Sequence, residues 1–242
     1  PYGWPARSSY FGIVDLAGFP KDIYYLYQSE WRPDKTVLHL FPHWNWEEGQ
    51  TIDMWAYYNN ADEAELFING QSQGIRRKLP AGPRTDELRD DIVMSTEFHV
   101  CWRVTYQPGT VKVVTRKDGE VVAEQEMHTA GTPAAIRLTP DRTQLTADGR
   151  DLSFVTVEVV DKDGNLCPWA EDDIHFQVEG NAFIAGVDNG SQTSMERFKD
   201  NHRKAFYGKC LVVIQNNGKS GKARLTATAD GLSTAHLQLK AR

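Results

Sequence analysis

Hydrophobic and polar residues alternate along much of this chain. The clearest run covers residues 96–106, where every second position from Phe98 to Tyr106 carries a large apolar side chain and the positions between are mostly polar. A period of two is typical of a β-strand with one face on a core and the other toward solvent. The pattern therefore predicts β-structure for most of the chain, with Trp102 in a core.

Short runs of this kind form two series, separated by a small, turn-forming stretch at residues 129–133, which we interpret as a linker. Pairs such as Asn69-Gly70 and Asp163-Gly164 supply the turns. The first series comprises residues 37–41, 52–58, 64–68, 96–106, 111–115 and 121–126; the second comprises residues 135–139, 144–146, 152–160, 174–178, 182–184, 211–214, 223–229 and 235–239. This spacing predicts two antiparallel β-sandwiches in tandem, over residues 35–131 and 132–242. For residues 191–208 we expect a long loop with one helical turn at 194–199.

Residues 1–34 follow a different pattern. The apolar run at residues 10–14 predicts a short strand, and apolar residues three and four apart, Ile23, Leu26 and Tyr27, then predict a helix over residues 20–31. Pro20 suits the first helical turn, where no N–H is needed. About twelve residues are too few to hold a helix alone in water. We therefore expect this helix to pack on the first sandwich, near the aromatic cluster at residues 41–46.

Composition narrows the possible partners. The 242 residues include 27 Lys and Arg against 33 Asp and Glu, a net charge of −6, so the basic excess of a nucleic-acid binder is missing. No apolar stretch approaches the roughly 20 residues that a membrane span needs. Cys101, Cys167 and Cys210 are too few and too scattered for a disulfide framework, and we expect free, buried or half-buried thiols. The chain also begins without Met, and we expect it to be a piece of a longer polypeptide.

Acidic side chains occur in three adjacent pairs, Glu47-Glu48, Asp90-Asp91 and Asp172-Asp173. Neighbouring residues on a strand point to opposite faces, so such pairs make poor acid and base partners. We interpret them as solvated charges in turns. No G-x-S-x-G motif is present to mark a nucleophilic serine. From the residues alone we therefore assign no catalytic residue, and substrate-binding residues stay unknown.

Two segments resemble metal sites at first sight. Residues 161–165 begin like a calcium loop, but Leu166 stands where that loop requires glycine and Pro168 interrupts it, which favours a hairpin turn. His39 and His43 have the H-x-x-x-H spacing, which joins two ligands only on a helix, whereas this segment is predicted to be a strand broken by Pro42. We predict neither a resident metal nor a cofactor.

Aromatic residues raise the question of sugar binding, because Trp rings stack on the apolar faces of sugars. For Trp44 and Trp46, in a turn-like segment, packing at a domain interface is favoured over a sugar platform. Trp55 and Trp102, on alternating strands, are expected in the core. The tripeptide at Asn189 matches an N-glycosylation acceptor, a weak signal by itself.

A family resemblance adds to this picture. Residues 8–22, with the sequence SSYFGIVDLAGFPKD, resemble the end of the catalytic (β/α)8 barrel in glycoside hydrolase family 2, of the β-galactosidase type common in gut Bacteroides, and the helix after them resembles the last barrel helix. Residues 37–46 and 65–70 resemble the immunoglobulin-like domain that follows the barrel. Residues 140–147, 187–190 and 203–208 resemble a further C-terminal domain, related to bacterial Ig-like repeats.

The resemblance implies a specific organisation. Residues 1–34 would be the end of a barrel, followed by two Ig-like sandwiches that act as non-catalytic accessory domains of a retaining hydrolase. Such enzymes use two glutamates, one as acid/base and one as nucleophile, about 5–5.5 Å apart. Those glutamates lie on earlier barrel strands, and neither Glu30 nor Glu65 matches their motifs, so this chain alone is expected to be inactive.

The resemblance also implies partners and a location. The partners would be the sugar-binding and barrel domains of the same polypeptide, and through them a carbohydrate; the location would be the periplasm or outside the cell. The alternative is a free-standing carbohydrate-binding or adhesin-like module, which would have no use for a strand and helix that need a barrel beside them.

Overall fold

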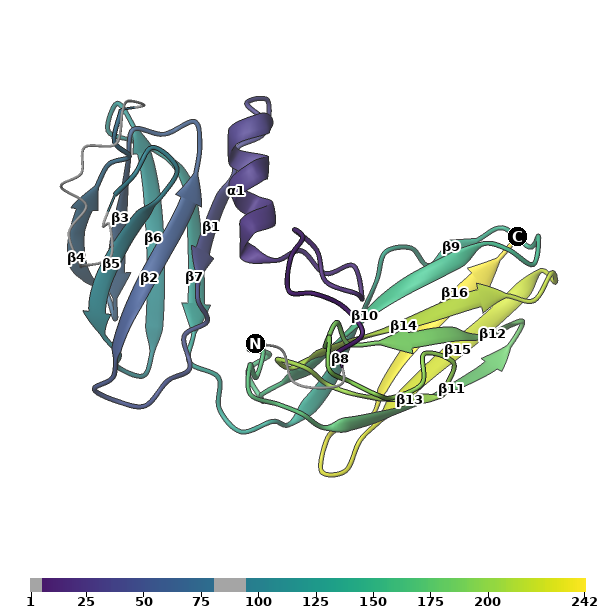
Figure 1. The fold of residues 1–242 in the computed structure, drawn as a ribbon. Coiled ribbons are helices and arrows are strands. Elements are labelled where there is room, and N and C mark those ends of the chain that lie inside the picture. The colour runs from purple at the N-terminus through teal and green to yellow at the C-terminus, as the bar shows by residue number, and fades with distance from the viewer. Residues whose placement is uncertain (1–5, 81–94) are drawn as a thin grey trace. The chain divides into compact units, whose positions relative to one another are not determined.

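The computed structural model of the chain describes residues 6–80 and 95–242. These residues are mostly β-strand, with one α-helix (Figure 1). Contacts group them into two units, one made of Pro20–Thr129 and the other of Ala130–Arg242 together with residues 6–19. The helix described is too short and too polar to cross a membrane.

The first unit is a sandwich of two antiparallel sheets, as predicted. One sheet has the order β1 (Leu38–Phe41), β2 (Thr51–Tyr58), β5 (Val100–Thr105), and the other has the order β4 (Gln71–Arg76), β3 (Glu63–Ile68), β6 (Thr110–Lys117), β7 (Glu120–His128). The sequence pattern did not reveal β4. Its residues are exposed along almost its whole length, so they show no alternation of apolar and polar positions.

Trp102 lies in the core between these sheets, and this prediction is confirmed. Its side chain is 1% exposed, and its indole Nε1–H donates to the carbonyl oxygen of Gly74 on β4 at 2.9 Å. This bond joins the two sheets. Phe98, expected on the same face, is 38% exposed, because β5 begins only at Val100.

Two other tryptophans lie where the sequence did not predict them. Trp44, expected at an interface, is 1% exposed in the core, with its ring edge-on to Tyr106 at 4.9 Å. Trp55, expected in the core, is half-buried on the outer face of its sheet, where its ring lies 4.3 Å from that of His99. The core positions of β2 are instead taken by residues such as Met54.

The helix α1 (Asp22–Trp31) packs on β1 and β2, which confirms the predicted contact with the first sandwich (Figure 1). Tyr25 stacks on His39 at 3.9 Å, and Asp22 Oδ1 lies 2.8 Å from His39 Nε2. His39 stacks in turn on Phe41, the first residue of the predicted aromatic cluster. The predicted apolar face is only partly covered, and Tyr27 is 37% exposed; Ser29 is the helix residue that is buried.

The second unit is also a sandwich of two sheets, as predicted. One sheet has the order β12 (Ala182–Asp188), β14 (Lys209–Asn216), β10 (Leu152–Val160), β8 (Ala135–Pro140). The other has the order β13 (His202–Lys204), β11 (Asp173–Gly180), β15 (Gly221–Thr228), β16 (Ala235–Ala241), β9 (Gln144–Leu145). Neighbouring strands are antiparallel except β16 and β9. Apolar side chains from both sheets, including Val157, Phe176 and Leu225, form its core.

Two local predictions were wrong. Residues 194–199 form no helical turn, and the long loop is interrupted by the short edge strand β13. Residues 10–14 form no strand of a sheet. A strand needs a neighbour for its backbone N–H and C=O groups, and an isolated apolar run does not supply one.

Candidate functional site

Arg203 on β13 has no solvent-exposed surface. Charged side chains are almost never fully buried unless they are paired. The residues that surround Arg203 are therefore a candidate functional site of the second unit. They consist of the loop at residues 189–201, which we name the β12–β13 loop, the end of β12, and residues 6–19, which we name the N-terminal segment.

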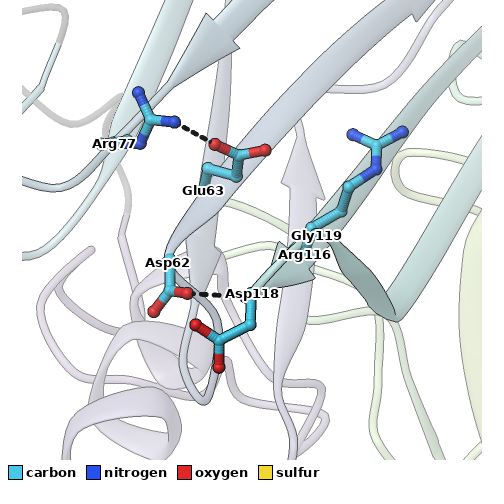
Figure 2. Close-up of a pocket in the computed structure, with 6 residues that line it drawn as sticks. All are labelled: Asp62, Glu63, Arg77, Arg116, Asp118 and Gly119. Carbon is cyan, nitrogen blue, oxygen red and sulfur yellow. Dashed lines mark hydrogen bonds and ion pairs between the residues drawn. The ribbon is translucent and has the colours of Figure 1, made fainter.

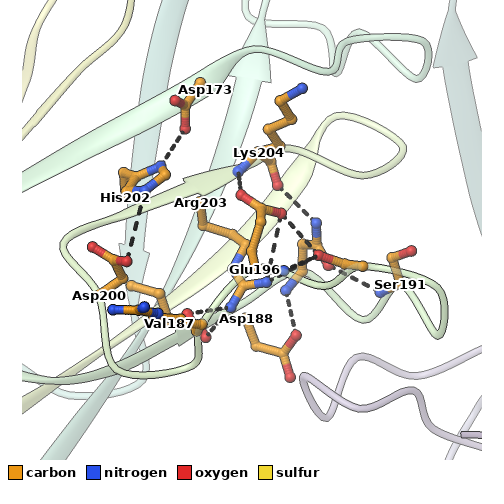
Figure 3. Close-up of polar contacts among 12 residues, drawn as sticks. Asp173, Val187, Asp188, Ser191, Glu196, Asp200, His202, Arg203 and Lys204 are labelled. Atoms are coloured by element: carbon orange, nitrogen blue, oxygen red, sulfur yellow. Dashed lines mark hydrogen bonds and ion pairs between the residues drawn. The ribbon is translucent and has the colours of Figure 1, made fainter. Parts of the chain in front are cut away.

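The Arg203 guanidinium organises the β12–β13 loop (Figure 3). Its Nη2 donates to the carbonyl oxygens of Val187 and Arg197, both at 2.9 Å, and its Nη1 donates to Ser194 Oγ at 3.2 Å. Its Nη1 also lies 3.6 Å from Glu196 Oε2. One side chain thus fixes three points of the loop and the end of β12.

The N-terminal segment lies on this loop. The backbone N–H of Arg7 donates to the carbonyl oxygen of Gln192 at 2.7 Å, and the Arg7 guanidinium lies 4.5 Å from the Phe198 ring centroid. Arg203 lies 5.7 Å from the same centroid. Cation–π contacts at partly exposed sites contribute about 0.5–1 kcal/mol each. Phe198 therefore connects the segment with the buried arginine.

A second contact involves Asp15 and Gly190. Gly190 has φ +77°, and a Cβ built on it would lie 2.5 Å from Asp15 Cγ, so the carboxyl group occupies the space that any other residue would need. Asp15 Oδ1 also accepts a hydrogen bond from the Phe19 N–H at 2.8 Å, which closes the turn at the end of the segment. Glycine at position 190 is thus required both by its backbone conformation and by this close approach.

The N-glycosylation match at Asn189 falls inside the same loop. Asn189 is 4% exposed; its Nδ2 donates to the carbonyl oxygen of Lys204 at 2.9 Å and its Oδ1 accepts from the Ser191 N–H at 3.0 Å. Its amide therefore supports the loop and is not accessible in the folded chain.

The N-terminal segment and α1 expose large apolar side chains. Phe11 is 86% exposed and Trp31 is 71% exposed, and the other members are Tyr10, Ile13, Val14, Leu16 and Tyr27. Tyr27 and Trp31 lie on α1 in the first unit and the others on the N-terminal segment in the second, and exposed apolar side chains on either element are typical of a surface that contacts another protein surface.

Histidine and carboxylate side chains converge beside Arg203. His202 Nδ1 lies 2.9 Å from Asp173 Oδ1, and its Nε2 lies 3.8 Å from Asp200 Oδ2 (Figure 3). The hydrogen bond that Asp173 accepts from His202 raises the pKa of the histidine. Single ligand atoms of Asp173, Glu196 and His202 lie within 4.8 Å of one another. Asp173 is thus paired rather than simply solvated, and sequence spacing did not single this group out.

Asp161, the first residue of the calcium-like loop, is 4% exposed and serves the turn. Its Oδ1 accepts from the N–H groups of Asp163 and Asn165 at 2.9 and 2.8 Å, and its Oδ2 accepts from the Gly131 N–H at 2.8 Å. Burial by itself would raise the pKa of Asp161, but these hydrogen bonds outweigh burial and lower the pKa to about 2. The interpretation as a hairpin turn is confirmed.

The remaining candidates have structural partners or are solvated. His39 contacts α1, while His43 stacks on Trp46 at 4.4 Å, and the Trp46 Nε1–H donates to the His43 carbonyl oxygen at 2.7 Å. Glu47 and Glu48 are exposed, as expected for solvated turn charges. The pair Asp90-Asp91 lies outside the described residues.

An open pocket of about 280 Å³ lies at one end of the first sandwich (Figure 2). Its lining is charged but mutually satisfied: Arg77 pairs with Glu63, and the Asp118 N–H donates to Asp62 Oδ2 at 2.9 Å. Arg116 pairs with Glu65 at 2.8 Å. Both arginines of the lining are thus paired, and its charged residues are two arginines and three carboxylates, so the pocket offers no unpaired cation to an anionic ligand.

Comparison with known proteins identifies both units. Residues 136–238 match the model of the glycoside hydrolase family 2 C-terminal domain 5, and residues 49–123 match a domain of unknown function (DUF4982). The whole chain is 68% identical over 241 residues to "Beta-galactosidase BoGH2A" of Bacteroides ovatus, of which it covers 26%. It is 32% identical over 217 residues to a "Putative beta-glucuronidase" of Formosa agariphila, of which it covers 20%.

Solved structures give the same result. A β-glycosidase from Bacteroides vulgatus superposes with a TM-score of 0.87 at 33% identity over 98% of this chain and 29% of its own. A family 2 glycosyl hydrolase from Bacteroides cellulosilyticus superposes with a TM-score of 0.81 at 30% identity over 96% of this chain and 31% of its own. The chain thus spans about a fifth to a third of the length of these relatives, and it belongs to glycoside hydrolase family 2, as part of the C-terminal region of that family.

Proposed function

We propose that this chain is the accessory C-terminal part of a retaining β-galactosidase, and that its two sandwiches support the catalytic barrel of that enzyme. The observation that carries the proposal is the 68% identity, over the whole chain, to a protein named as a β-galactosidase. More distant relatives are named as β-glucuronidases, so the sugar is the part of the proposal that most needs a test.

The carboxylates of this chain support a non-catalytic role. Glu30 pairs with Lys78 at 3.0 Å, and Glu65 pairs with Arg116 at 2.8 Å. A general acid needs a raised pKa near the working pH. Among the described carboxylates the resolved pKa shifts are downward, as at Asp34, Glu158 and Asp161, which is the direction expected for carboxylates that serve structure.

The mechanism we propose is mechanical support. The N-terminal segment, which resembles the end of the barrel, is held by the β12–β13 loop, and α1, which resembles the last barrel helix, is held by His39 of the first sandwich. The second sandwich would thus bind the N-terminal segment, and the first sandwich would bind α1, the next piece of the barrel in the sequence. The exposed side chains of Phe11 and Trp31 would be covered by the rest of the barrel in the whole enzyme.

The partners in this proposal are the sugar-binding and barrel domains of the same polypeptide, with a carbohydrate substrate bound by the whole enzyme. We also propose a periplasmic or secreted location, which rests on the family resemblance alone.

The test compares the complete reading frame with this chain. The complete protein should hydrolyse an aryl β-galactoside faster than an aryl β-glucuronide, with retention of configuration at the anomeric carbon. The isolated chain should be inactive on both. Turnover by the pure chain that disappears when one of its own carboxylates is replaced would contradict the accessory role. A preference for the glucuronide would contradict the sugar but not the role.

A further inference from the structure

We infer that Asp173, Glu196 and His202 form a binding site for a divalent transition metal ion, of which Zn²⁺ fits best. The three ligands come from β11, the β12–β13 loop and β13, and one atom of each lies within 4.8 Å of the others. Imidazole nitrogen and carboxylate oxygen are ligands that Zn²⁺ accepts at about 2.0–2.2 Å, so closing the site requires side-chain adjustments on the order of 1 Å.

The surroundings of His202 fit this use. Its Nδ1 faces Asp173 and its Nε2 faces the Asp200 carboxylate at 3.8 Å. A histidine that binds a metal through one ring nitrogen usually directs the other N–H to a carboxylate or carbonyl, which sets the tautomer and the ring orientation. The Asp200 carboxylate lies on that side of the ring and would form this hydrogen bond after an approach on the order of 1 Å. His175 stacks on the His202 ring at 5.3 Å and further restricts its orientation.

The carboxylate ligands are also oriented. Glu196 Oε1 accepts from the Lys204 N–H at 3.1 Å and its Oε2 accepts from Ser194 Oγ at 2.9 Å, so the loop carboxylate is held toward β13. Asp173 Oδ2 lies 3.4 Å from His175 Nε2. Each carboxylate therefore keeps its position before any metal arrives, which lowers the ordering cost of binding.

The charge balance favours a dication. Asp173, Glu196 and Asp200 bring three carboxylates together, and Arg203 is the cation beside them, 3.6 Å from Glu196. The Lys204 side chain extends away from Glu196 (Figure 3). These three carboxylates and Arg203 together carry an excess of negative charge, which a divalent ion would offset. An imidazole ligand among the three, with no ring of carbonyl oxygens, favours Zn²⁺ over Mg²⁺ or Ca²⁺.

Metal binding would attach the β12–β13 loop at one further point, Glu196, which lies between the loop residues Ser194 and Arg197 that Arg203 holds. Arg203 holds Val187, Ser194 and Arg197, whereas the metal would join Glu196 to two strands of the five-stranded sheet. The loop that holds the N-terminal segment would therefore become more rigid when the metal is bound.

The experiment uses the intact chain without an affinity tag. We expect one Zn²⁺ to bind per chain by calorimetric titration, a rise in Tm with added Zn²⁺ and none with Mg²⁺, and slower amide exchange over residues 191–201. His202→Ala should weaken Zn²⁺ binding by more than tenfold. Asp200→Asn removes no ligand and should weaken it by about tenfold or more, the usual effect of changing the partner of a ligating histidine.

The matched control is His236→Ala. His236 is an exposed histidine on β16 of the same sheet, where its Nδ1 contacts Thr226 Oγ1 at 3.0 Å, so its removal should leave Zn²⁺ binding unchanged. Absence of saturable Zn²⁺ binding to the native chain would overturn the inference, and so would native affinity in His202→Ala. If His202→Ala does not fold by circular dichroism, the comparison of Asp200→Asn with His236→Ala decides in the same way. All of these readouts are independent of hydrolytic activity.

Discussion

Replacing Gly190 by alanine should detach the N-terminal segment from the second sandwich. The added methyl group would overlap the Asp15 carboxyl group, since an ideal Cβ lies 2.5 Å from Asp15 Cγ. Gly190 also has φ +77°, where an alanine costs about 1–2 kcal/mol. The variant therefore suffers two separate penalties, and the experiment has to distinguish them.

Gly231→Ala provides the matched control. Gly231 has φ +74° and belongs to the same unit, but no heavy atom lies within 4 Å of its ideal Cβ. It should lose the same 1–2 kcal/mol from backbone strain and nothing more. The difference between the two variants isolates the contact with Asp15.

The magnitude of that difference follows from what Asp15 must give up. If its carboxylate moves away, the hydrogen bond from the Phe19 N–H is lost, and a bond to a charged group contributes about 1.5–3 kcal/mol. The loss of global stability cannot exceed what docking contributes, because the segment can detach while the sandwich stays folded. We therefore expect Gly190→Ala to lose up to about 3 kcal/mol more than Gly231→Ala.

Amide exchange at Arg7 is the most direct assay, because this N–H donates to Gln192 only while the segment is docked. A docking loss of 1.5–3 kcal/mol corresponds to exchange about 10- to 150-fold faster in Gly190→Ala. Urea melts of both variants measure the loss in the global free energy of unfolding. The double variant Asp15→Ala/Gly190→Ala should show non-additivity, because removing the carboxyl group removes the overlap. Equal losses in the two glycine variants, with unchanged exchange at Arg7, would refute the proposed contact.

Three further predictions concern stability and reactivity. Trp102→Ala should lower the free energy of unfolding by about 3–5 kcal/mol in urea melts, because the side chain is 1% exposed. Trp169→Ala is the control, because this side chain is 57% exposed and its removal should change the stability by less than about 0.5 kcal/mol. A loss below about 1 kcal/mol for Trp102→Ala would contradict its core position. Asp161→Asn should cost about 1.5–3 kcal/mol, because an amide would set its own N–H against the backbone donors. The pKa of Asp161 in the folded state is lowered to about 2, so the stabilisation by its carboxylate is fully present above the unfolded pKa of about 3.9 and is lost as the pH falls toward 2. In melts at decreasing pH, the native chain should therefore lose this stability and the variant should not. Cys101, Cys167 and Cys210 are buried and burial raises their pKa, to about 12 for Cys101, so a thiol reagent should modify them only after unfolding.

The alternation of apolar and polar positions was sufficient to predict most of the fold, because a strand in a sheet that is solvated on one face has apolar residues at every second position. It located the strand of Trp102 and both sandwiches. It missed β4 because an edge strand exposed on both faces carries no such pattern. It misplaced Trp44, whose segment has turn-like composition although the side chain is buried in the core.

The candidate site was much harder to predict from the sequence. Charge normally indicates exposure, so nothing local marks Arg203 as buried. The pairing of Asp15 with Gly190 and the convergence of Asp173 with Glu196 depend on contacts between residues far apart in the chain, which periodicity does not report. The family resemblance supplied the organisation of the chain, whereas these contacts required the structure.

The second unit is discontinuous in sequence, and this has a consequence for synthesis on the ribosome. The first unit, Pro20–Thr129, is a single continuous stretch and can fold as soon as it has emerged. The N-terminal segment has to wait for Gln192 and Gly190 to be translated, and at about 5–20 residues per second this delay is on the order of 10 to 40 seconds. During that interval Arg7 and Asp15 lack the loop residues that they contact in the folded chain. The nascent polypeptide should therefore carry this segment undocked until the β12–β13 loop has been translated, and β9 has to wait in the same way for β16, its parallel partner.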